Sequence, residues 1–170
     1  FSFSRFGITV LTDDALGGCQ RIFDLNLFDN RITEISEKSL VMLTNLQSIN
    51  LDQNMLTQLP ENVFSSQKNL LTLDIRNNPF QIFTSDVFRT LESLEILHLQ
   101  NTRIKSIDPE WFTTTKNLHS LFLNRNNITE LTRDVFVSLE KLNTLALTSN
   151  NIREIHSEVF HPLTKLQTLQ

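Results

Sequence analysis

The side chains that could carry out chemistry are few and scattered along the sequence. There is one cysteine, Cys19, and the histidines are His98, His119, His156 and His161. A lone thiol without neighbouring cations is not arranged as a nucleophile, because reactive cysteines lie in electropositive surroundings. We therefore interpret Cys19 as a small apolar residue of the interior.

No spacing of these residues indicates a catalytic or metal site. His98 and His119 fall on neighbouring strands of the repeat pattern, so they could form a metal site or a pH sensor. No carboxylate or third ligand stands at a matching spacing, and we interpret both as surface histidines. With three glycines, the chain contains no phosphate-binding loop of the GxGxxG or Walker type. The sequence predicts no enzyme activity, no cofactor and no metal.

Apolar residues recur along the whole chain with a period of 24 residues. A fixed period of this length predicts a solenoid of similar units, each in contact with its neighbours alone. Alternating apolar residues in each unit predict a short strand, so we expect eight parallel strands. We number the repeats 1 to 8: they span 1–21 (partial), 22–45, 46–69, 70–93, 94–117, 118–141, 142–165 and 166–170 (partial). Neither end carries a polar cap, so we expect an internal fragment of a longer array.

The repeat pattern LxxLxLxxNxIxxIxxxxFxxLxx resembles the typical 24-residue class of leucine-rich repeat, as in Toll-like receptor ectodomains and secreted insect immune proteins. The resemblance covers the whole chain. It implies an α/β fold, a curved solenoid with a parallel β-sheet on the concave face and irregular or short helical segments on the convex face. It also implies an extracellular setting, secreted or cell-surface, and work in innate immune recognition or as a receptor ectodomain.

Two columns of side chains are expected inside the solenoid. One holds amides that can satisfy backbone groups at the bend after each strand: Asn30, Asn54, Asn78, Asn126 and Asn150. The other holds rings that fill the outer half of the core: Phe64, Phe88, Phe112, Phe136 and Phe160. Thr102 replaces the amide in repeat 5 and predicts a local loosening there. Gln67 and Thr115 stand where Leu is usual and predict a leakier convex side.

The outward residues of the strands vary in size, charge and aromaticity, which suits a recognition surface on a fixed scaffold. Its early part is expected to be an acidic strip that steers a basic partner: Asp24, Asp29, Asp52 and Asp74. Aromatic and arginine side chains are the usual anchors of protein interfaces. We predict a partner-binding patch made of Asp74, Arg76, His98, Gln100, Phe122, Asn124 and Arg125.

Partners and location follow from the remaining features. Asn127-Ile128-Thr129 is an N-glycosylation acceptor at an exposed position, and it predicts a glycan on Asn127 in an extracellular protein. A net charge of −4 argues against a nucleic-acid partner. No apolar run approaches the length of a membrane span.

The predicted function is therefore non-catalytic recognition of a protein ligand or co-receptor on the concave face, with homo- or heterodimerisation left open. A structural or adhesive spacer, or a dimerisation scaffold, is the first alternative, and it would use the convex side around Trp111, Arg133 and His156. An intracellular leucine-rich repeat scaffold is the second alternative.

Overall fold

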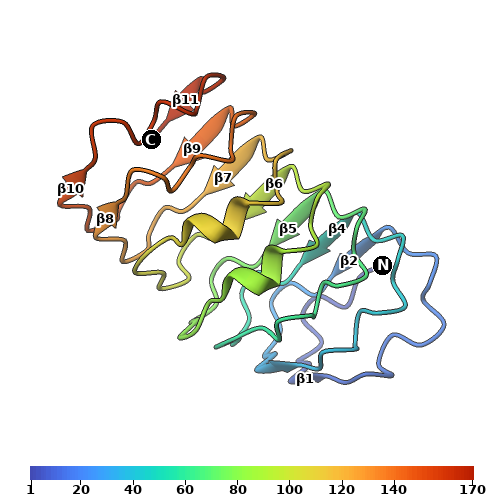
Figure 1. Ribbon diagram of the computed structural model, residues 1–170. Coiled ribbons are helices and arrows are strands. Elements are labelled where there is room, and N and C mark those ends of the chain that lie inside the picture. Colours follow the sequence, from blue (N-terminus) through green and yellow to red (C-terminus); the bar gives the residue numbers. More distant parts are fainter.

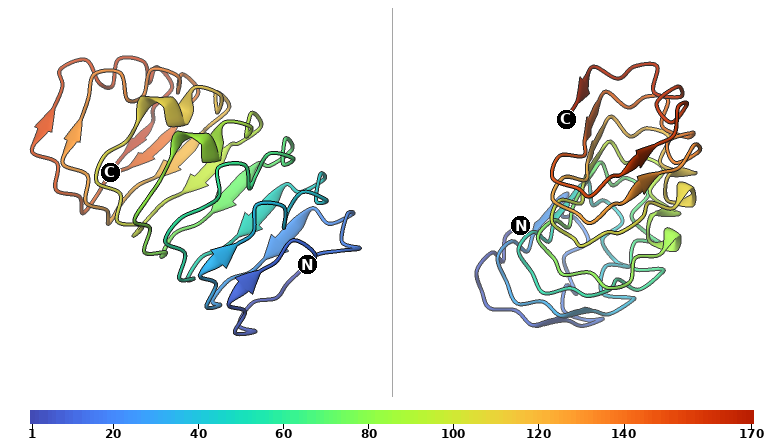
Figure 2. Two further views of the ribbon diagram at one scale, coloured as in Figure 1. Left: turned by 60° about the horizontal axis from the view of Figure 1, so that its bottom comes forward. Right: turned by 90° about the vertical axis from the view of Figure 1, so that its left-hand side faces the viewer.

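A computed structural model describes residues 1–170 as a curved stack of coils, each running once around a shared apolar interior (Figures 1 and 2). A seven-stranded parallel sheet lines the concave face, in the order β11-β9-β7-β6-β5-β4-β2. Neighbouring strands pair in register between repeats, as Leu97 with Leu121 and Leu121 with Leu145. The eighth expected strand is reduced to a single bridge between Ser2 and Asn26. The predicted solenoid is confirmed.

The strands are two or three residues long. Those of the main sheet are β2 (Asp24–Asn26), β4 (Ser48–Asn50), β5 (Thr72–Asp74), β6 (Ile96–His98), β7 (Ser120–Phe122), β9 (Thr144–Ala146) and β11 (Thr168–Leu169). Away from the sheet, β1 (Val10–Leu11) pairs with β3 (Glu34–Ile35), and β8 (Glu130–Leu131) pairs with β10 (Glu154–Ile155). Repeats 4 and 5 instead contain short 3-10 helices, η1 (Ser85–Phe88) and η2 (Pro109–Phe112). Neither helix has the length and apolarity to cross a membrane.

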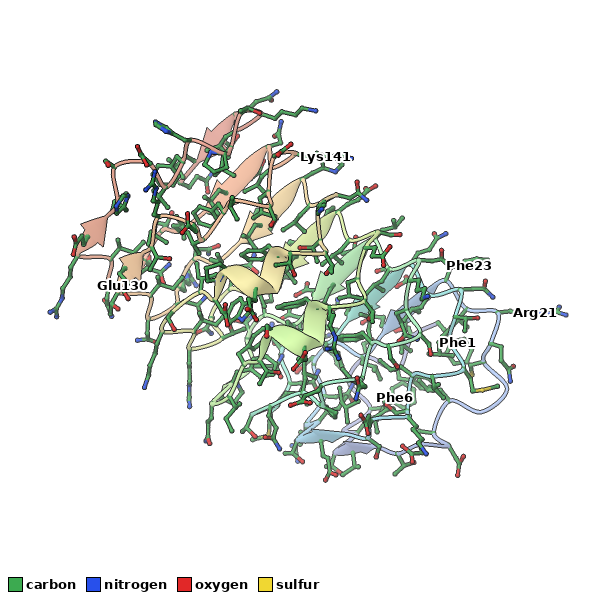
Figure 3. All side chains as sticks on the ribbon, viewed as in Figure 1. Phe1, Phe6, Arg21, Phe23, Glu130 and Lys141 are labelled. Atoms are coloured by element: carbon green, nitrogen blue, oxygen red, sulfur yellow. The ribbon has the colours of Figure 1, made fainter.

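The apolar columns form one continuous core that runs through the stack. Four rings of the Phe column are at most 1% exposed: Phe64, Phe88, Phe112 and Phe136. Phe160, in repeat 7, is only partly buried, and so is Cys19 in repeat 1. Large rings are exposed at the N-terminal end of the stack, where Figure 3 shows Phe1, Phe6 and Phe23.

The Asn column ties each repeat to the one before it. Each amide nitrogen donates to two strand-end carbonyls, one in its own repeat and one in the preceding repeat, at 2.7–3.0 Å. Each amide oxygen accepts a backbone N–H of the preceding repeat at 3.0–3.1 Å. These backbone groups face the apolar interior and have no strand partner there, so the amides remove a cost of about 1–3 kcal/mol for each group.

Gln67 and Thr115 do not loosen the convex side, and that prediction is wrong. Both side chains are fully buried. The Gln67 amide nitrogen donates to the Leu40 carbonyl at 2.7 Å, so it crosses to the preceding repeat much as the Asn column does. The Gln67 amide oxygen and the Thr115 hydroxyl are left buried without a hydrogen-bond partner. A polar residue in a Leu column is therefore accommodated inside the stack.

Thr102 does loosen the stack, between repeats 4 and 5. Its hydroxyl donates to the Leu99 carbonyl at 2.7 Å, but it makes no bond to repeat 4. The Arg103 N–H also makes no bond to repeat 4, whereas Met55 and Asn127, at the same position in repeats 3 and 6, donate to the preceding repeat at 2.9 and 2.7 Å. As a result, no hydrogen bond joins residues 79–87 to residues 103–111.

The backbone after Thr102 also takes a different path. Arg103 is left-handed, with φ of 63°. At the same position, the one other left-handed residue is Gly7, with φ of 75°, and it follows Phe6 in the other repeat that lacks the amide. The column amide therefore holds the next residue in its ordinary conformation. In repeat 5 this left-handed turn borders an open pocket of about 530 Å³ between repeats 4 and 5.

Replacing Thr102 by Asn should raise the free energy of unfolding by about 1 kcal/mol, because the new amide can donate to the Ile75 carbonyl across the gap. Thr102→Val should lower the free energy of unfolding, since it removes the hydroxyl bonded to Leu99 and to the Asn126 amide oxygen. Urea unfolding of the two variants measures both effects. Equal destabilisation by Asn and Val would contradict the role assigned to the missing amide.

Candidate functional site

The predicted patch is assembled on the concave face by three consecutive strands. Asp74, His98 and Phe122 lie side by side in register at the ends of β5, β6 and β7. Two residues further on in each repeat, the chain leaves the sheet and forms one wall of a hollow of about 320 Å³. No apolar residue lines this hollow, which is formed by Asp52, Gln53, Arg76, Asn77, Gln100, Asn101, Asn124 and Arg125.

The acidic strip is not as predicted, because two of its four carboxylates are buried. Asp52 is 2% exposed and Asp74 is 8% exposed. Arg76 folds back over both, with its Nε 3.0 Å from Asp52 Oδ2 and 3.4 Å from Asp74 Oδ2. Asp52 Oδ1 accepts a second bond from the Asn77 amide at 2.7 Å. The centre of the concave face is thus an internally compensated charge cluster, and exposed acid remains at the N-terminal end, at Asp24.

Asp74 also has a local role that its column shares. Its Oδ1 accepts the backbone N–H of Arg76 at 3.2 Å, and Asn26 and Asn50 accept the equivalent N–H groups of Phe28 and Asp52 at 2.9 Å. The polar residue that ends β2, β4 or β5 therefore fixes the turn that follows. The carboxylate holds both the loop and the guanidinium of the patch.

His98 and Phe122 form a stacked pair rather than two separate exposed groups. Their rings are 4.6 Å apart and nearly parallel, at 4°. The Gln100 amide lies 3.2 Å from His98 Nδ1, which fixes the imidazole from its other side. The Gln100 amide oxygen is buried and has no partner. His98 is in register with Phe122 and not with His119, which is exposed.

Residues Gln53, Asn77 and Asn101 complete the hollow, and the sequence interpretation missed them. They belong to the position just before the Asn column, which is left-handed in every repeat from 2 to 7. Asn101 donates to the Asn77 amide oxygen at 3.0 Å, so their side chains link repeats 5 and 4. In the sequence this position is filled by Asp, Gln, Asn, Arg or Ser in repeats 2 to 7, and this run of polar residues could have indicated that it faces the hollow. Arg125 occupies it in repeat 6 and stays exposed without an ion-pair partner.

Burial sets the protonation of this cluster. Desolvation raises the pKa of Asp74 to about 6, against the opposing charge of Arg76, while Asp52 raises it further. Burial lowers the pKa of His98, and the Arg76 charge lowers it again. As the pH falls through about 6, Asp74 becomes neutral while Arg76 keeps its charge. The patch therefore gains positive charge in mildly acidic surroundings.

The convex-side alternative loses one of its three residues. Trp111 is 3% exposed and packs in the interior at 4.9 Å from the Phe83 ring. Arg133 forms an ion pair with Glu158, and His156 is exposed. Asn127 is exposed, as expected for a glycan acceptor.

The raised pKa of Asp74 favours its protonated form in the folded state. The stability that Asp74 contributes is therefore complete below pH 3.8, the ordinary pKa of an aspartate, and is lost as the pH rises through about 6. The lowered pKa of His98 acts in the opposite sense, with a contribution that is present above pH 6.5 and lost on acidification.

We expect Asp74 to titrate near pH 6 in the folded chain, because its carboxyl is desolvated. Relative to Asp74→Asn, the wild-type chain should lose roughly 3 kcal/mol of unfolding free energy as the pH rises through this range. Carboxyl-carbon NMR gives the titration midpoint, and urea unfolding at each pH gives the free energy. Arg76→Gln should move the midpoint higher, because it removes the charge that lowers this pKa. A midpoint near 3.8, or a lower one in Arg76→Gln, would disprove the assignment.

Comparison with known proteins identifies the class of fold. The family model described as "Leucine rich repeat" matches residues 3–56, 44–104, 92–152 and 116–170. The chain belongs to the leucine-rich repeat family. Comparison with curated proteins finds no match.

Two solved structures specify the similarity further. The structure of a TLR13–ssRNA13 complex is 28% identical, with a TM-score of 0.92 over 99% of this chain and 24% of that chain. The structure of the Toll–Spatzle complex of Drosophila is 21% identical, with a TM-score of 0.61 over 96% of this chain and 28% of that chain. The chain thus spans about a quarter of each, and its fold is that of their repeat arrays. Because the first is a complex with single-stranded RNA, the sequence-based argument against nucleic acid is not supported.

Proposed function

We propose that the chain is a non-catalytic recognition module that binds a protein ligand in the concave hollow, in an innate immune or receptor setting. The observation that carries this proposal is the pre-ordered hollow itself. Its walls are held by hydrogen bonds between repeats 3, 4 and 5, so little conformational freedom is lost on binding. The binding group that remains available is the exposed Arg125, which has no ion-pair partner.

The chemistry of the hollow favours a protein ligand. A polypeptide can offer a carboxylate to Arg125 and an apolar side chain to the half-buried ring of Phe122 beside the hollow. Arg76 is already neutralised by two carboxylates, so the hollow lacks the row of free cations that neutralises a run of phosphates. The proposal accords with the similar Toll structure, a complex with the protein Spatzle.

Single-stranded RNA is a second candidate, supported by one specific observation. The His98–Phe122 stack presents flat rings of the kind on which unpaired bases stack, and the similar TLR13 structure is a complex with single-stranded RNA. Neutralisation of Asp74 below about pH 6 would leave Asp52 as the one charged partner of Arg76 and lower the negative charge that opposes a phosphate. This candidate therefore predicts binding that strengthens on acidification.

Phe122→Ala should weaken binding of selected protein ligands about tenfold, because it removes the aromatic anchor and its stack with His98. The ligands are obtained by selecting a displayed peptide library on the immobilised wild-type chain, and affinities are then measured on the variants. Phe28→Ala is the matched control, since Phe28 is also a half-buried aromatic residue of the concave face but lies outside the patch.

A pool of random-sequence single-stranded RNA, tested at pH 7.5 and pH 5.5, forms the parallel arm. Retention of RNA, stronger at the lower pH and lost in Arg125→Gln, would favour the second candidate over the first. A Phe122→Ala variant that melts several degrees lower yet keeps full affinity for the selected peptides would refute the proposed patch.

We further propose that the chain is extracellular and carries a glycan on Asn127. Asn127 and Thr129 are both exposed, and the Asn127 side chain makes no hydrogen bond that would hold it against the surface. Asn127-Ile128-Thr129 is the one Asn-x-Ser/Thr motif in the sequence. An N-linked glycan found on the chain can therefore be assigned to Asn127.

Expression through a eukaryotic secretory route should add one N-linked glycan to the chain. Intact-protein mass spectrometry before and after treatment with peptide-N-glycosidase detects it. Thr129→Ala, which keeps the asparagine but removes the acceptor motif, should abolish the added mass. A secreted wild-type chain without the glycan would shift the interpretation to the intracellular scaffold.

A further inference from the structure

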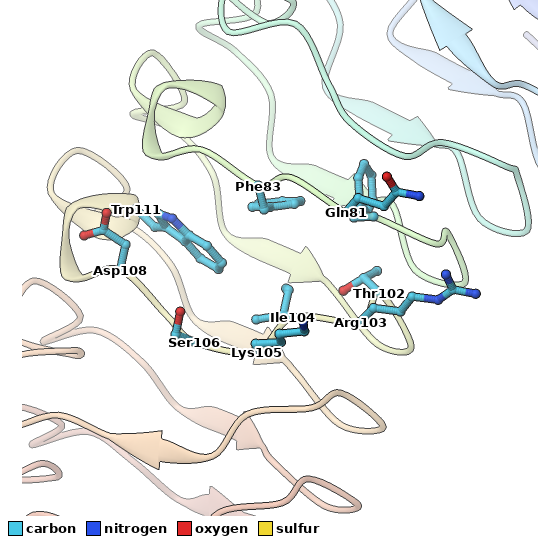
Figure 4. A pocket seen from close by; sticks show the side chains of 10 residues that line it. Gln81, Phe83, Thr102, Arg103, Ile104, Lys105, Ser106, Asp108 and Trp111 are labelled. Atoms are coloured by element: carbon cyan, nitrogen blue, oxygen red, sulfur yellow. The ribbon is translucent and has the colours of Figure 1, made fainter.

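The gap between repeats 4 and 5 forms an open pocket with aromatic residues along part of its wall, and it shares no residue with the concave hollow. Figure 4 shows the segment Thr102–Ser106 along one side, Phe83 of repeat 4 across from it, and Trp111 of η2 at one end. The rings of Phe83 and Trp111 lie 4.9 Å apart, and Phe80 stacks edge-on against Phe83 at 5.2 Å. These contacts make a rigid aromatic wall, with Ile104 facing it.

The rim of this pocket is cationic. Arg103 and Lys105 are exposed, and neither forms an ion pair or a side-chain hydrogen bond. One carboxylate, Asp108, also lines the pocket, but it is engaged as the cap of η2, where it accepts the Glu110 N–H at 2.9 Å. Two cations against one engaged carboxylate leave a site that favours an anion.

The backbone at the rim turns at a position that is left-handed in only one other repeat. Arg103 adopts this conformation where repeat 1 uses a glycine, Gly7. The turn lies where hydrogen bonds between repeats 4 and 5 are missing, beside the pocket.

We propose that this pocket binds a small aromatic anion. Its flat apolar body would lie against Phe83, Ile104 and Trp111, and its carboxylate, sulfonate or phosphate group would face Arg103 and Lys105. The volume of about 530 Å³ lies within the range of small-molecule sites, roughly 300–1,000 Å³. The site is separate from the concave patch, and no residue is shared between the two.

The sequence offers an internal reporter for this site. Trp111 is the only tryptophan, and the chain has no tyrosine, so tryptophan emission arises from the pocket wall alone. The probe is 8-anilino-1-naphthalenesulfonate, a flat aromatic anion that accepts energy from tryptophan. N-phenyl-1-naphthylamine, which has the same rings without the sulfonate, is the uncharged control. Saturable quenching of Trp111 with matching naphthalene emission is the expected signature.

Three variants decide the assignment. Arg103→Gln with Lys105→Gln removes both charges but keeps the chain length, so it should weaken the sulfonate roughly fivefold, as expected of exposed ion pairs, and leave the neutral probe within about twofold. Arg31→Gln removes the cation at the same position in repeat 2 and should change neither. Ser106→Phe, an exposed residue of the pocket wall, places a ring in the pocket and should abolish both signals. Circular dichroism confirms that the variants fold.

The opposite results would overturn the proposal. Naphthalene emission without quenching of Trp111 would mean that the probe binds elsewhere. Equal affinities of the wild-type and Ser106→Phe chains, or equal loss of the charged and uncharged probes in the double Gln variant, would show that the pocket or its cations do not select an aromatic anion. Failure here leaves the concave patch untouched, because the peptide test uses different residues.

Discussion

The amide hydrogen bonds of the Asn column are the constraint on which the structure depends. A single repeat of 24 residues cannot bury its apolar face alone, so stability comes from stacking. Stacking also places strand-end carbonyls inside the core, where an unpaired carbonyl would offset much of the gain from burying leucines. One amide serves two repeats at once, as Asn78 does for Leu51 and Ile75. It thereby fixes the distance and register between neighbouring repeats.

That register explains why so much of the fold could be predicted from the sequence. Leu121 and Phe136 recur at a fixed period, and a periodic side chain in a stack has no alternative but the interior. Outward positions carry no such constraint. Asp52 and Asp74 were predicted to be exposed because alternate strand residues face solvent. Their burial depends on the length and direction of Arg76, which closes over both, and single-column patterns do not record this contact.

The errors on the convex side have a related cause. Gln67 was interpreted as a defect because it is polar, but its amide finds the Leu40 carbonyl of the neighbouring repeat. Trp111 was placed on the convex surface, yet its indole is 3% exposed and packs 4.9 Å from the Phe83 ring of the preceding repeat. The Thr102 substitution predicted a loosening, which takes the form of a missing side-chain bond from repeat 5 to repeat 4. Each outcome depends on a contact between residues of adjacent repeats. A single column of the sequence pattern names one partner of that contact and leaves out the other.

The same pairing rule keeps the concave patch intact beside the gap. Between repeats 4 and 5, the strand-side bonds persist, with Ile75 N–H to the His98 carbonyl at 3.2 Å and Asn77 N–H to the Gln100 carbonyl at 2.9 Å. Hydrogen bonds are lost only beyond Thr102, on the wall that returns toward the convex side. The hydrogen bonds on the strand side hold the side chains of the patch in register, while the wall without them borders a pocket lined by the half-buried Phe83 ring. A solenoid can therefore present two kinds of surface within one pair of repeats, because its inter-repeat bonds are divided between walls.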